Sequence, residues 1–273
     1  MPTYLVSGAN RGLGYEMVKQ LSALPRTYIL AGCRSPSDAP ELAALAENSG
    51  GRIKVVQLEV TDPESVKNVV GEVEMWEHTK GGLDVLLNNA GVFAGGWASA
   101  LEAYVVASCI CPSGRSAYPS GRTPADIQSN ININLYGTIS LTLALLPSLL
   151  RTAASTSTED DGGPVKQIYT YSSGMGSITS THNNALAGGA AYSVSKAALD
   201  MWTVKLGLQL RKEGKDVVVK ALHPGWATTG MTGAGEGYVS PEDSVKGMIE
   251  VIRSAKPGDP TVLVSYKNEV LPW

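Results

Sequence analysis

The sequence contains little cysteine and no excess of basic residues. Its 273 residues include three cysteines, Cys33, Cys109 and Cys111, and a Cys-x-Cys pair without a second ligand pair does not make a zinc site. The chain starts directly with a strand-like pattern and lacks the charged and apolar regions of a signal peptide. We therefore expect reduced thiols, no metal and a cytoplasmic location. The formal net charge of −3 predicts a small-molecule partner and no nucleic acid.

Long apolar runs are also missing. The most apolar segment, residues 135–150, is shorter than the roughly 20 residues that a bilayer requires, and it contains Tyr136, Thr138, Ser140, Thr142 and Pro147. It predicts a buried helix, or one that pairs with a second copy, and no membrane span. A chain of 273 residues with 43% hydrophobic content can bury one large core, so we expect a single domain over residues 1–273. We also expect a homo-oligomer, a dimer or a tetramer.

The pair Tyr192 and Lys196 is the most informative feature that is present. Residues four apart project from the same face of a helix, so the phenol and the ammonium would lie side by side. An ammonium favours the phenolate, and we expect it to lower the pKa of Tyr192 toward neutrality. By itself the pattern also fits an ordinary exposed pair.

A glycine-rich turn lies near the amino terminus. The β-prone residues 3–6 lead into Ser7-Gly8-Ala9-Asn10-Arg11-Gly12-Leu13-Gly14, and an amphipathic stretch follows. Glycines at this spacing let the backbone approach a pyrophosphate, whose charge is met by the amino terminus of the helix. The alternative is a purely structural strand-to-helix corner.

Arg34 follows the next expected strand, where a dinucleotide fold meets the adenosine ribose. An acid there would bind the 2′-hydroxyl of NAD, whereas a guanidinium suits the 2′-phosphate of NADP. Arg11, inside the glycine turn, can approach the same phosphate. Although either arginine alone fits a surface charge, the pair favours NADP(H).

Strands and helices alternate along the whole chain. We expect a doubly wound parallel sheet of the Rossmann type, an α/β fold with a cofactor across the carboxyl ends of its strands. The expected strands are residues 27–33, 52–58, 83–87, 165–171, 217–222 and 261–264, in addition to 3–6. The expected later helices are residues 39–48, one that begins at Pro63 after an Asp62 cap, 126–150 and 241–254.

Six motifs together resemble the short-chain dehydrogenase/reductase family. They are the glycine turn, Asn88-Asn89-Ala90-Gly91, Asn134 in Asn-Leu-Tyr-Gly, Ser172-Ser173, Tyr192-x-x-x-Lys196, and Pro224-Gly225 followed by Thr229. Residues 222–226 and 271–273 are similar to the carbonyl-reductase-like branch, which includes sniffer-type reductases and fungal ketoreductases of the norsolorinic acid type.

The resemblance implies hydride transfer from a nicotinamide to a carbonyl carbon, with four catalytic residues. Tyr192 would protonate the developing alkoxide, Lys196 would lower the pKa of Tyr192 and hold the ribose, Ser173 would bind the carbonyl oxygen, and Asn134 would support a water linked to Lys196. The resemblance also implies cofactor contacts from Gly8, Asn10, Arg11, Gly12, Leu13, Gly14, Arg34, Glu59, Val60, Asn89, Ala90, Gly91, Tyr192, Lys196, Pro224, Gly225, Ala227 and Thr229.

The chain departs from the family pattern in several places. Ser7 replaces a usual Thr, and Glu59 stands where Asp or Asn commonly contacts adenine. The interval from Gly91 to Asn134 is long, and its irregular part, residues 101–122, predicts a loop insertion, either solvated or a substrate lid. Residues 152–163 predict a surface loop. Residues 182–184 are expected on a widened loop over the cleft, with His182 either solvated or a second acid.

The sequence therefore predicts an NADPH-dependent reductase. Met175, Trp226 and Met231 fall near the expected cleft and suggest a small apolar or aromatic ketone or aldehyde as substrate, although each also fits a core position. Two alternatives remain open. One is a regulatory protein that binds a dinucleotide without catalysis, and the other is an NAD-linked alcohol dehydrogenase, against which Arg11 and Arg34 argue.

Overall fold

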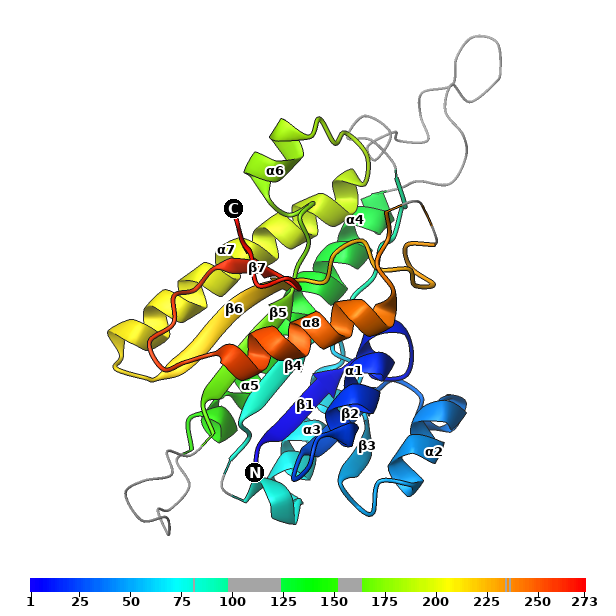
Figure 1. Ribbon diagram of the computed structural model, residues 1–273, viewed down its shortest axis with the longest axis vertical. Helices are drawn as coiled ribbons and strands as arrows, with labels where there is room; N and C mark the ends of the chain where they lie inside the picture. Colours follow the sequence, from blue (N-terminus) through cyan, green and yellow to red (C-terminus); the bar gives the residue numbers. More distant parts are fainter. Residues whose placement is uncertain (81, 98–123, 152–163, 234, 236) are drawn as a thin grey trace.

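Parallel strands alternate with helices along the chain, as the sequence predicts (Figure 1). The computed structural model describes residues 1–80, 82–97, 124–151, 164–233, 235 and 237–273. The insertion expected at 101–122 and the loop expected at 152–163 lie outside the described residues.

The strands are β1 (Thr3–Ser7), β2 (Tyr28–Cys33), β3 (Ile53–Gln57), β4 (Val85–Asn88), β5 (Lys166–Tyr171), β6 (Val217–His223), β7 (Leu263–Ser265) and β8 (Val270–Leu271). The α-helices are α1 (Gly12–Ala23), α2 (Pro40–Glu47), α3 (Pro63–Met75), α4 (Pro124–Asn130), α5 (Thr138–Leu149), α6 (Ile178–Asn183), α7 (Ala190–Lys212) and α8 (Pro241–Ser254). The 3₁₀ turns are η1 (Pro36–Asp38) and η2 (Glu77–Thr79), and η4 (Ile131–Gly137) is a π-helix.

One sheet organises the single domain. Its strand order is β3-β2-β1-β4-β5-β6-β7-β8, and all neighbours pair in parallel except β7 and β8. The order reverses between β1 and β4, so the loops that follow these two strands diverge to opposite faces. A doubly wound sheet binds its ligand at this switch point.

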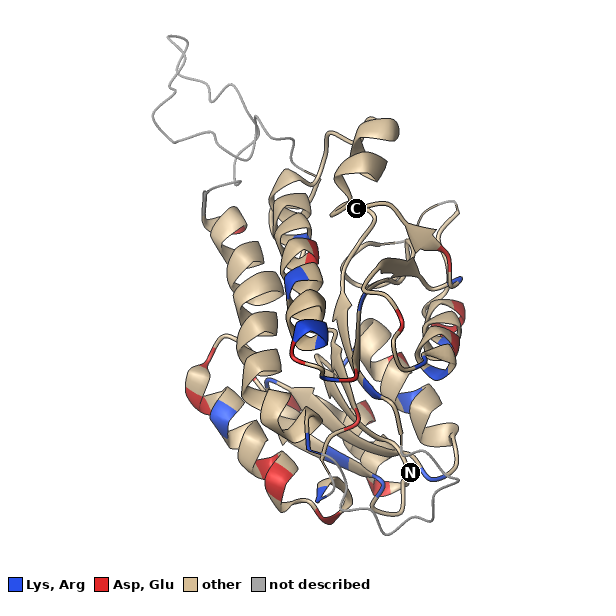
Figure 2. Ribbon diagram, turned by 90° about the vertical axis from the view of Figure 1, so that its left-hand side faces the viewer, with Lys and Arg blue, Asp and Glu red and all other residues tan. Residues whose placement is uncertain are grey.

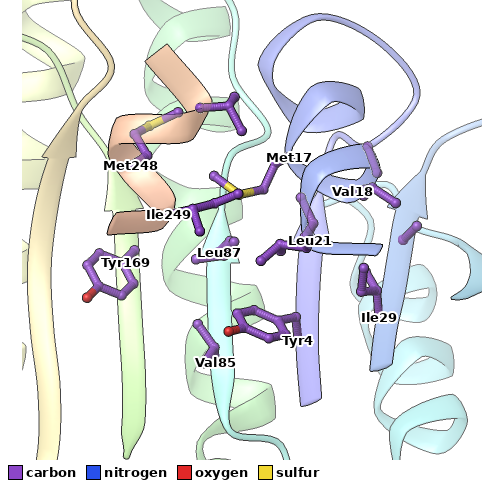
Figure 3. Close-up of a cluster of buried hydrophobic side chains, with 14 of the residues drawn as sticks. Tyr4, Met17, Val18, Leu21, Ile29, Val85, Leu87, Tyr169, Met248 and Ile249 are labelled. Carbon is purple, nitrogen blue, oxygen red and sulfur yellow. The ribbon is translucent and has the colours of Figure 1, made fainter. Parts of the chain in front are cut away.

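One face of the sheet is covered by α1 and α8. Tyr4, Leu87 and Tyr169 point from the strands toward Met17 and Leu21 of α1 and Met248 and Ile249 of α8 (Figure 3). Most of these side chains are fully buried. Each of these two helices has an apolar stripe on an otherwise polar surface. Because this stripe packs against the sheet, the positions of both helices and of the glycine turn that precedes α1 are fixed.

The opposite face is covered by α3, α5 and α7, which bury Val69, Leu141, Leu145 and Leu206 against Leu86 and its neighbours. Figure 2 shows few charged residues along α4 and α5, whereas α3 and α8 contain residues of both signs. No helix within the described ranges is both long enough and apolar enough to cross a membrane.

Several helix starts follow from local chemistry. The Asp62 side chain accepts a hydrogen bond from the Glu64 N–H, and Pro63 opens α3, as the sequence predicts. Ser240 caps α8 in the same way by accepting from the Asp243 N–H. The cap satisfies a backbone donor that has no partner within the helix.

Three local features differ from the sequence-based expectation. The helix expected over 126–150 contains the π-helical turns of η4, which periodicity alone does not reveal. Residues 182–183 end the short helix α6 rather than lying in a loop, because Ser177 caps its first turn. The two-residue strand β8, which pairs antiparallel with β7, has too little pattern to be predicted.

Candidate active site

A cavity of about 620 Å³ opens at the carboxyl edge of the strands, next to the switch point. Of the residues expected to contact a cofactor, all except Gly225 and Ala227 line it. They are Gly8, Asn10, Arg11, Gly12, Leu13, Gly14, Arg34, Glu59, Val60, Asn89, Ala90, Gly91, Tyr192, Lys196, Pro224 and Thr229. The fold thus brings together residues from five strand ends and from the start of α7.

The glycine turn is held close to the end of β4. Gly8 has a φ of +68°, a conformation that side chains disfavour, and a Cβ on Gly14 would overlap the carbonyl oxygen of Gly8. The Asn89 side-chain amide donates to the carbonyl oxygens of Ser7 at 2.8 Å and Gly8 at 3.1 Å. Asn89 and the glycines therefore set the width of the turn.

The hydroxyl of Ser7 makes the hydrogen bonds that the hydroxyl of the usual Thr could make at this position. Its Oγ accepts hydrogen bonds from the backbone N–H groups of Asn89 at 3.1 Å and Ala90 at 3.0 Å. These two bonds join the loops after β1 and β4 across the switch point. The replacement of Thr by Ser keeps the hydroxyl that makes them.

The amino terminus of α1 has no side-chain cap. Arg11 occupies the cap position in an extended conformation and makes no capping hydrogen bond, in contrast to Asp62 and Ser240 at α3 and α8. Arg11, Gly12 and Leu13 line the cavity. The free N–H groups of the first turn and the helix dipole can therefore hold an anion there, such as a pyrophosphate.

Arg34 and Glu59 lie side by side at the ends of β2 and β3. Arg34 Nε is 3.9 Å from Glu59 Oε2, and 70% of the Arg34 side chain is exposed. The other oxygen of Glu59 accepts from the Thr61 N–H at 3.1 Å and from its hydroxyl at 2.8 Å. Glu59 is thus held by its own loop, and the Arg34 guanidinium remains accessible at the cavity.

Tyr192 and Lys196 lie on the first turns of α7 and face the cavity. Lys196 is 4% exposed, and its Nζ donates to the carbonyl oxygen of Tyr171 at 2.6 Å. The same Nζ lies 5.5 Å from the centre of the Tyr192 ring. The two side chains are neighbours, as the spacing predicts, although the ammonium is not hydrogen-bonded to the phenol.

The expected lowering of the Tyr192 pKa is wrong for the protein alone. Burial raises the pKa of Tyr192 to about 12, and a hydrogen bond with Ser173 opposes this rise only in part. Burial also lowers the pKa of Lys196 to about 8, against the opposing effect of Asp200. Burial is the largest cause of both pKa shifts, whereas sequence spacing reports only that the two groups are close.

Asn134 is fully buried in η4 and joins three segments. Its side-chain amide accepts from the Val92 N–H at 2.8 Å and donates to the Val92 carbonyl oxygen at 3.0 Å and the Ser195 Oγ at 2.9 Å. A Cβ on Gly91 would lie 3.2 Å from Asn134 Oδ1 and 3.8 Å from Lys196 Nζ. Gly91 therefore separates Asn134 from Lys196 and leaves the space between them free of side chains.

A second cavity of about 80 Å³ adjoins the first. Ser173, Met175, Trp226 and Met231, which the sequence places near the cleft, all line it, as do Gly225 and Ala227. Tyr192 lines both cavities. The phenol therefore stands where a molecule in one cavity would meet a molecule in the other.

Aromatic rings form one wall of the small cavity. The ring of Phe93 meets Tyr192 edge-on with the centroids 5.0 Å apart, and it meets Trp97 at 5.3 Å. Trp97 stacks on Trp226 at 5.5 Å. The wall favours an apolar or aromatic group next to the phenol.

The comparisons with known proteins agree with this geometry. A family model described as short chain dehydrogenase matches residues 2–236. The chain belongs to the short-chain dehydrogenase family. It is 28% identical to the short chain dehydrogenase gsfK of Penicillium aethiopicum, over 99% of each chain.

Solved structures of carbonyl reductases share the whole fold. The NADPH-bound carbonyl reductase from chicken fatty liver is 30% identical, with a TM-score of 0.77 over 100% of this chain and 99% of that one. Carbonyl reductase Sniffer of D. melanogaster is 28% identical, with a TM-score of 0.80 over 100% of both chains. The chain is therefore an oxidoreductase of a family that binds nicotinamide dinucleotides, in its carbonyl-reductase-like branch.

Sequence reasoning missed four residues at the site of this short-chain dehydrogenase. Phe93 and Trp97 follow the Asn-Asn-Ala-Gly motif, so their place after a strand end is a signal that could have found them. His223 ends β6 and lines the small cavity. Asp200, one helical turn beyond Lys196, is 4% exposed, and its position on the Tyr192 and Lys196 face of α7 was readable from the spacing.

Proposed function

We propose that this protein reduces the carbonyl group of a small apolar or aromatic ketone or aldehyde with NADPH. The observation that carries the proposal is the position of Tyr192, which lines both the large cavity at the strand ends and the small, mainly apolar one. A cofactor in the first and a substrate in the second would meet beside a proton donor. Family membership supports the same reaction class.

The large cavity fits a dinucleotide. The uncapped first turn of α1 suits the pyrophosphate, and Gly8 and Gly14 let the glycine turn pack tightly against itself and the loop after β4. The accessible guanidinium of Arg34, together with exposed Arg11, suits a 2′-phosphate. The chicken carbonyl reductase, with NADPH bound, is consistent with this choice. When bound, NADPH would supply the hydride.

Four side chains would manage the proton and the charge. The raised pKa of Tyr192, about 12, keeps the phenol protonated at neutral pH, as a general acid requires. Ser173, which lines the small cavity together with Tyr192, would donate to the carbonyl oxygen. Lys196 would hold the nicotinamide ribose and stabilise the phenolate that forms. Asn134 would support a water beside Gly91, in the space toward Lys196 Nζ.

We expect the protein to act as a homo-oligomer, a dimer or a tetramer. Two helices of the same face expose apolar side chains, Tyr136 and Leu143 at η4 and α5 and Met201 and Leu208 on α7, each more than half exposed. The near absence of charge along α4 and α5 (Figure 2) would let a second copy cover them at little desolvation cost. Sedimentation equilibrium of the full chain tests this expectation.

A carbonyl screen tests the function. The purified protein is incubated with NADPH and a panel of aryl and alkyl ketones and aldehydes, and the loss of NADPH absorbance is followed. We expect turnover with several apolar members and little with NADH. Tight NADPH binding without any turnover would favour the non-catalytic regulatory alternative, and oxidation of alcohols with NAD as the only activity would favour the alcohol dehydrogenase alternative.

A further inference from the structure

His223 stands out because it contributes an imidazole to the lining of the small, mainly apolar cavity. It ends β6 and lines this cavity together with Ser173, Met175, Tyr192 and Trp226, but it does not line the large one. Its neighbours Met175 and Trp226 offer an apolar environment. Whatever His223 binds must therefore arrive with the molecule that enters this cavity.

The tautomer of His223 follows from its one side-chain hydrogen bond. The Gly174 N–H donates to Nδ1 at 3.2 Å. Burial lowers the pKa of His223 to about 4, so the imidazole is neutral at physiological pH. A neutral imidazole that accepts at Nδ1 carries its proton on Nε2. His223 is thus a fixed donor at Nε2.

This donor is open and has no partner within the described part of the chain. A Cβ on Gly174 would lie 3.6 Å from Nε2, so the glycine leaves this flank of the ring uncovered. No hydrogen bond joins His223 Nε2 to the described hydroxyls that line the same cavity: Thr229 and Thr232 bond each other at 3.1 Å, and Ser173 Oγ accepts from the Met175 N–H at 3.2 Å. Enclosing an N–H against a ligand without an acceptor costs free energy.

We infer that His223 selects, from its Nε2, substrates that carry a second oxygen atom near the reacting carbonyl. The inference rests on the proposed function. Tyr192 and Ser173 would bind the carbonyl oxygen, and His223 would donate to a hydroxyl, ether or carbonyl oxygen a few bonds away, since all three side chains line the same small cavity. A simple alkyl ketone would leave Nε2 without a partner. The substrate class is therefore a short oxygenated ketone or aldehyde.

Two substitutions of His223 test the roles of its ring nitrogens Nδ1 and Nε2 one at a time. In His223→Asn the amide oxygen can take the place of Nδ1 and keep the Gly174 bond, but nothing reaches the Nε2 position. In His223→Gln the amide nitrogen can reach the Nε2 position, but the acceptor for Gly174 is lost. A selective role predicts that only Asn abolishes the preference, whereas a purely structural role predicts that Gln is the more damaging change for every substrate.

The experiment measures kcat/KM with NADPH for matched ketones that differ by hydroxyl against methyl. The pairs are hydroxyacetone with 2-butanone, 4-hydroxy-2-butanone with 2-pentanone, and 5-hydroxy-2-pentanone with 2-hexanone. Intrinsic reactivity cancels when the ratio within a pair is compared between proteins. We expect the ratio of at least one pair to fall about tenfold in His223→Asn, the value of one hydrogen bond, and to be retained in His223→Gln.

The outcomes distinguish this inference from the function on which it rests. An equal ratio in the parent and in His223→Asn for all three pairs overturns the inference and leaves the reductase function standing. The same holds if His223→Gln loses the preference while His223→Asn keeps it. A parent that binds NADPH but reduces no member of any pair and nothing in the wider screen overturns the function, and the inference with it.

Discussion

The two cavities that meet at Tyr192 are built in different ways. The large one is lined in good part by glycines and small residues of the loops that follow strand ends, such as Gly8, Gly12 and Ala90. The small one is lined mainly by large side chains, and Trp97, Met175 and Trp226 line it alone. The sheet therefore fixes the first, whereas the choice of side chains shapes the second.

This difference separates what the family shares from what an individual chain can change. A wall made of backbone cannot be altered by substitution without moving the strands, so it suits a ligand common to the family. A wall made of side chains can be altered one residue at a time, so it suits a ligand that varies between members. Substitutions in the walls and at the phenol between them therefore test this difference.

The largest effect is expected at the phenol itself. Tyr192→Phe removes only the hydroxyl, so the helix, Lys196 and both cavity walls should persist. Carbonyl reduction should fall by roughly 10²–10⁴-fold, the usual contribution of a general acid, while the Kd for NADPH stays nearly constant. Single-turnover NADPH oxidation and fluorescence titration of the cofactor measure the two quantities.

Lys196→Met is the matched comparison for this substitution. Because the same ammonium is assigned to the ribose and to the phenolate, we expect both cofactor affinity and turnover to fall. Full activity of Tyr192→Phe would refute the assignment of the proton donor, and unchanged cofactor affinity in Lys196→Met would refute the ribose contact.

The next effect concerns the cofactor end of the large cavity. Arg34→Asp replaces the guanidinium assigned to the 2′-phosphate, and we expect NADPH affinity to fall roughly 100-fold relative to NADH affinity. Lys67→Asp is the control, since Lys67 is 75% exposed, compared with 70% for Arg34, and does not line the cavity. The ratio of the NADPH and NADH dissociation constants is compared between the two variants. If it shifts equally in both, Arg34 acts only through its long-range charge and does not contact the 2′-phosphate.

A smaller effect tests the backbone wall directly. The Cβ of Gly14→Ala would overlap the Gly8 carbonyl and approach the Asn89 amide, so the turn must widen, at a cost of about 1–3 kcal/mol in cofactor binding. Gly71→Ala, in α3 with open space around it, should instead stabilise the fold by about 0.5–1 kcal/mol. Isothermal titration with NADPH and thermal unfolding of both variants measure these effects. Equal cofactor affinity in both variants would mean that the turn tolerates a side chain.

The residues that line the large cavity were easier to predict from the sequence than those that line the small one, because many of the former directly follow strand ends. Ser7, Asn88, Tyr171 and His223 end strands in one parallel sheet, so the residues that follow them in sequence must share one edge in space. The small cavity depends on which side chains meet across loops. The stacking of Trp97 on Trp226 joins segments on opposite sides of the site, and no local pattern encodes it.

Helix positions were predictable where caps and periodicity agreed, as at α3 and α8. The π-helical turns around Asn134 were not, because a wider turn changes the direction of one side chain without changing the apolar pattern. The pKa of Tyr192 was predicted with the wrong sign, since its value depends on burial by residues distant in sequence.

The last prediction concerns Asp200, a buried carboxyl on the same face of α7 as Tyr192 and Lys196. Within the described residues its two oxygens lack hydrogen-bond partners of regular geometry. Burial raises its pKa from 3.8 to about 7, and Ser172 and Lys196 offset this only in part. Between these two pH values the folded protein holds a proton that the unfolded chain has lost, so this group makes stability fall as pH rises.

His223 has the opposite effect over most of the same range. Its pKa is lowered from 6.5 to about 4, so the unfolded chain binds the extra proton there and stability rises with pH, which cancels the effect of Asp200. Asp200→Asn should therefore convert a nearly flat stability curve between pH 4 and 6.5 into one that rises by about 1.4 kcal/mol per pH unit. Urea unfolding across this range measures the slopes, with Glu47→Gln, an exposed carboxylate on α2, as the control. Parallel curves for the parent and Asp200→Asn would mean that Asp200 is ionised throughout and that Lys196 compensates its charge.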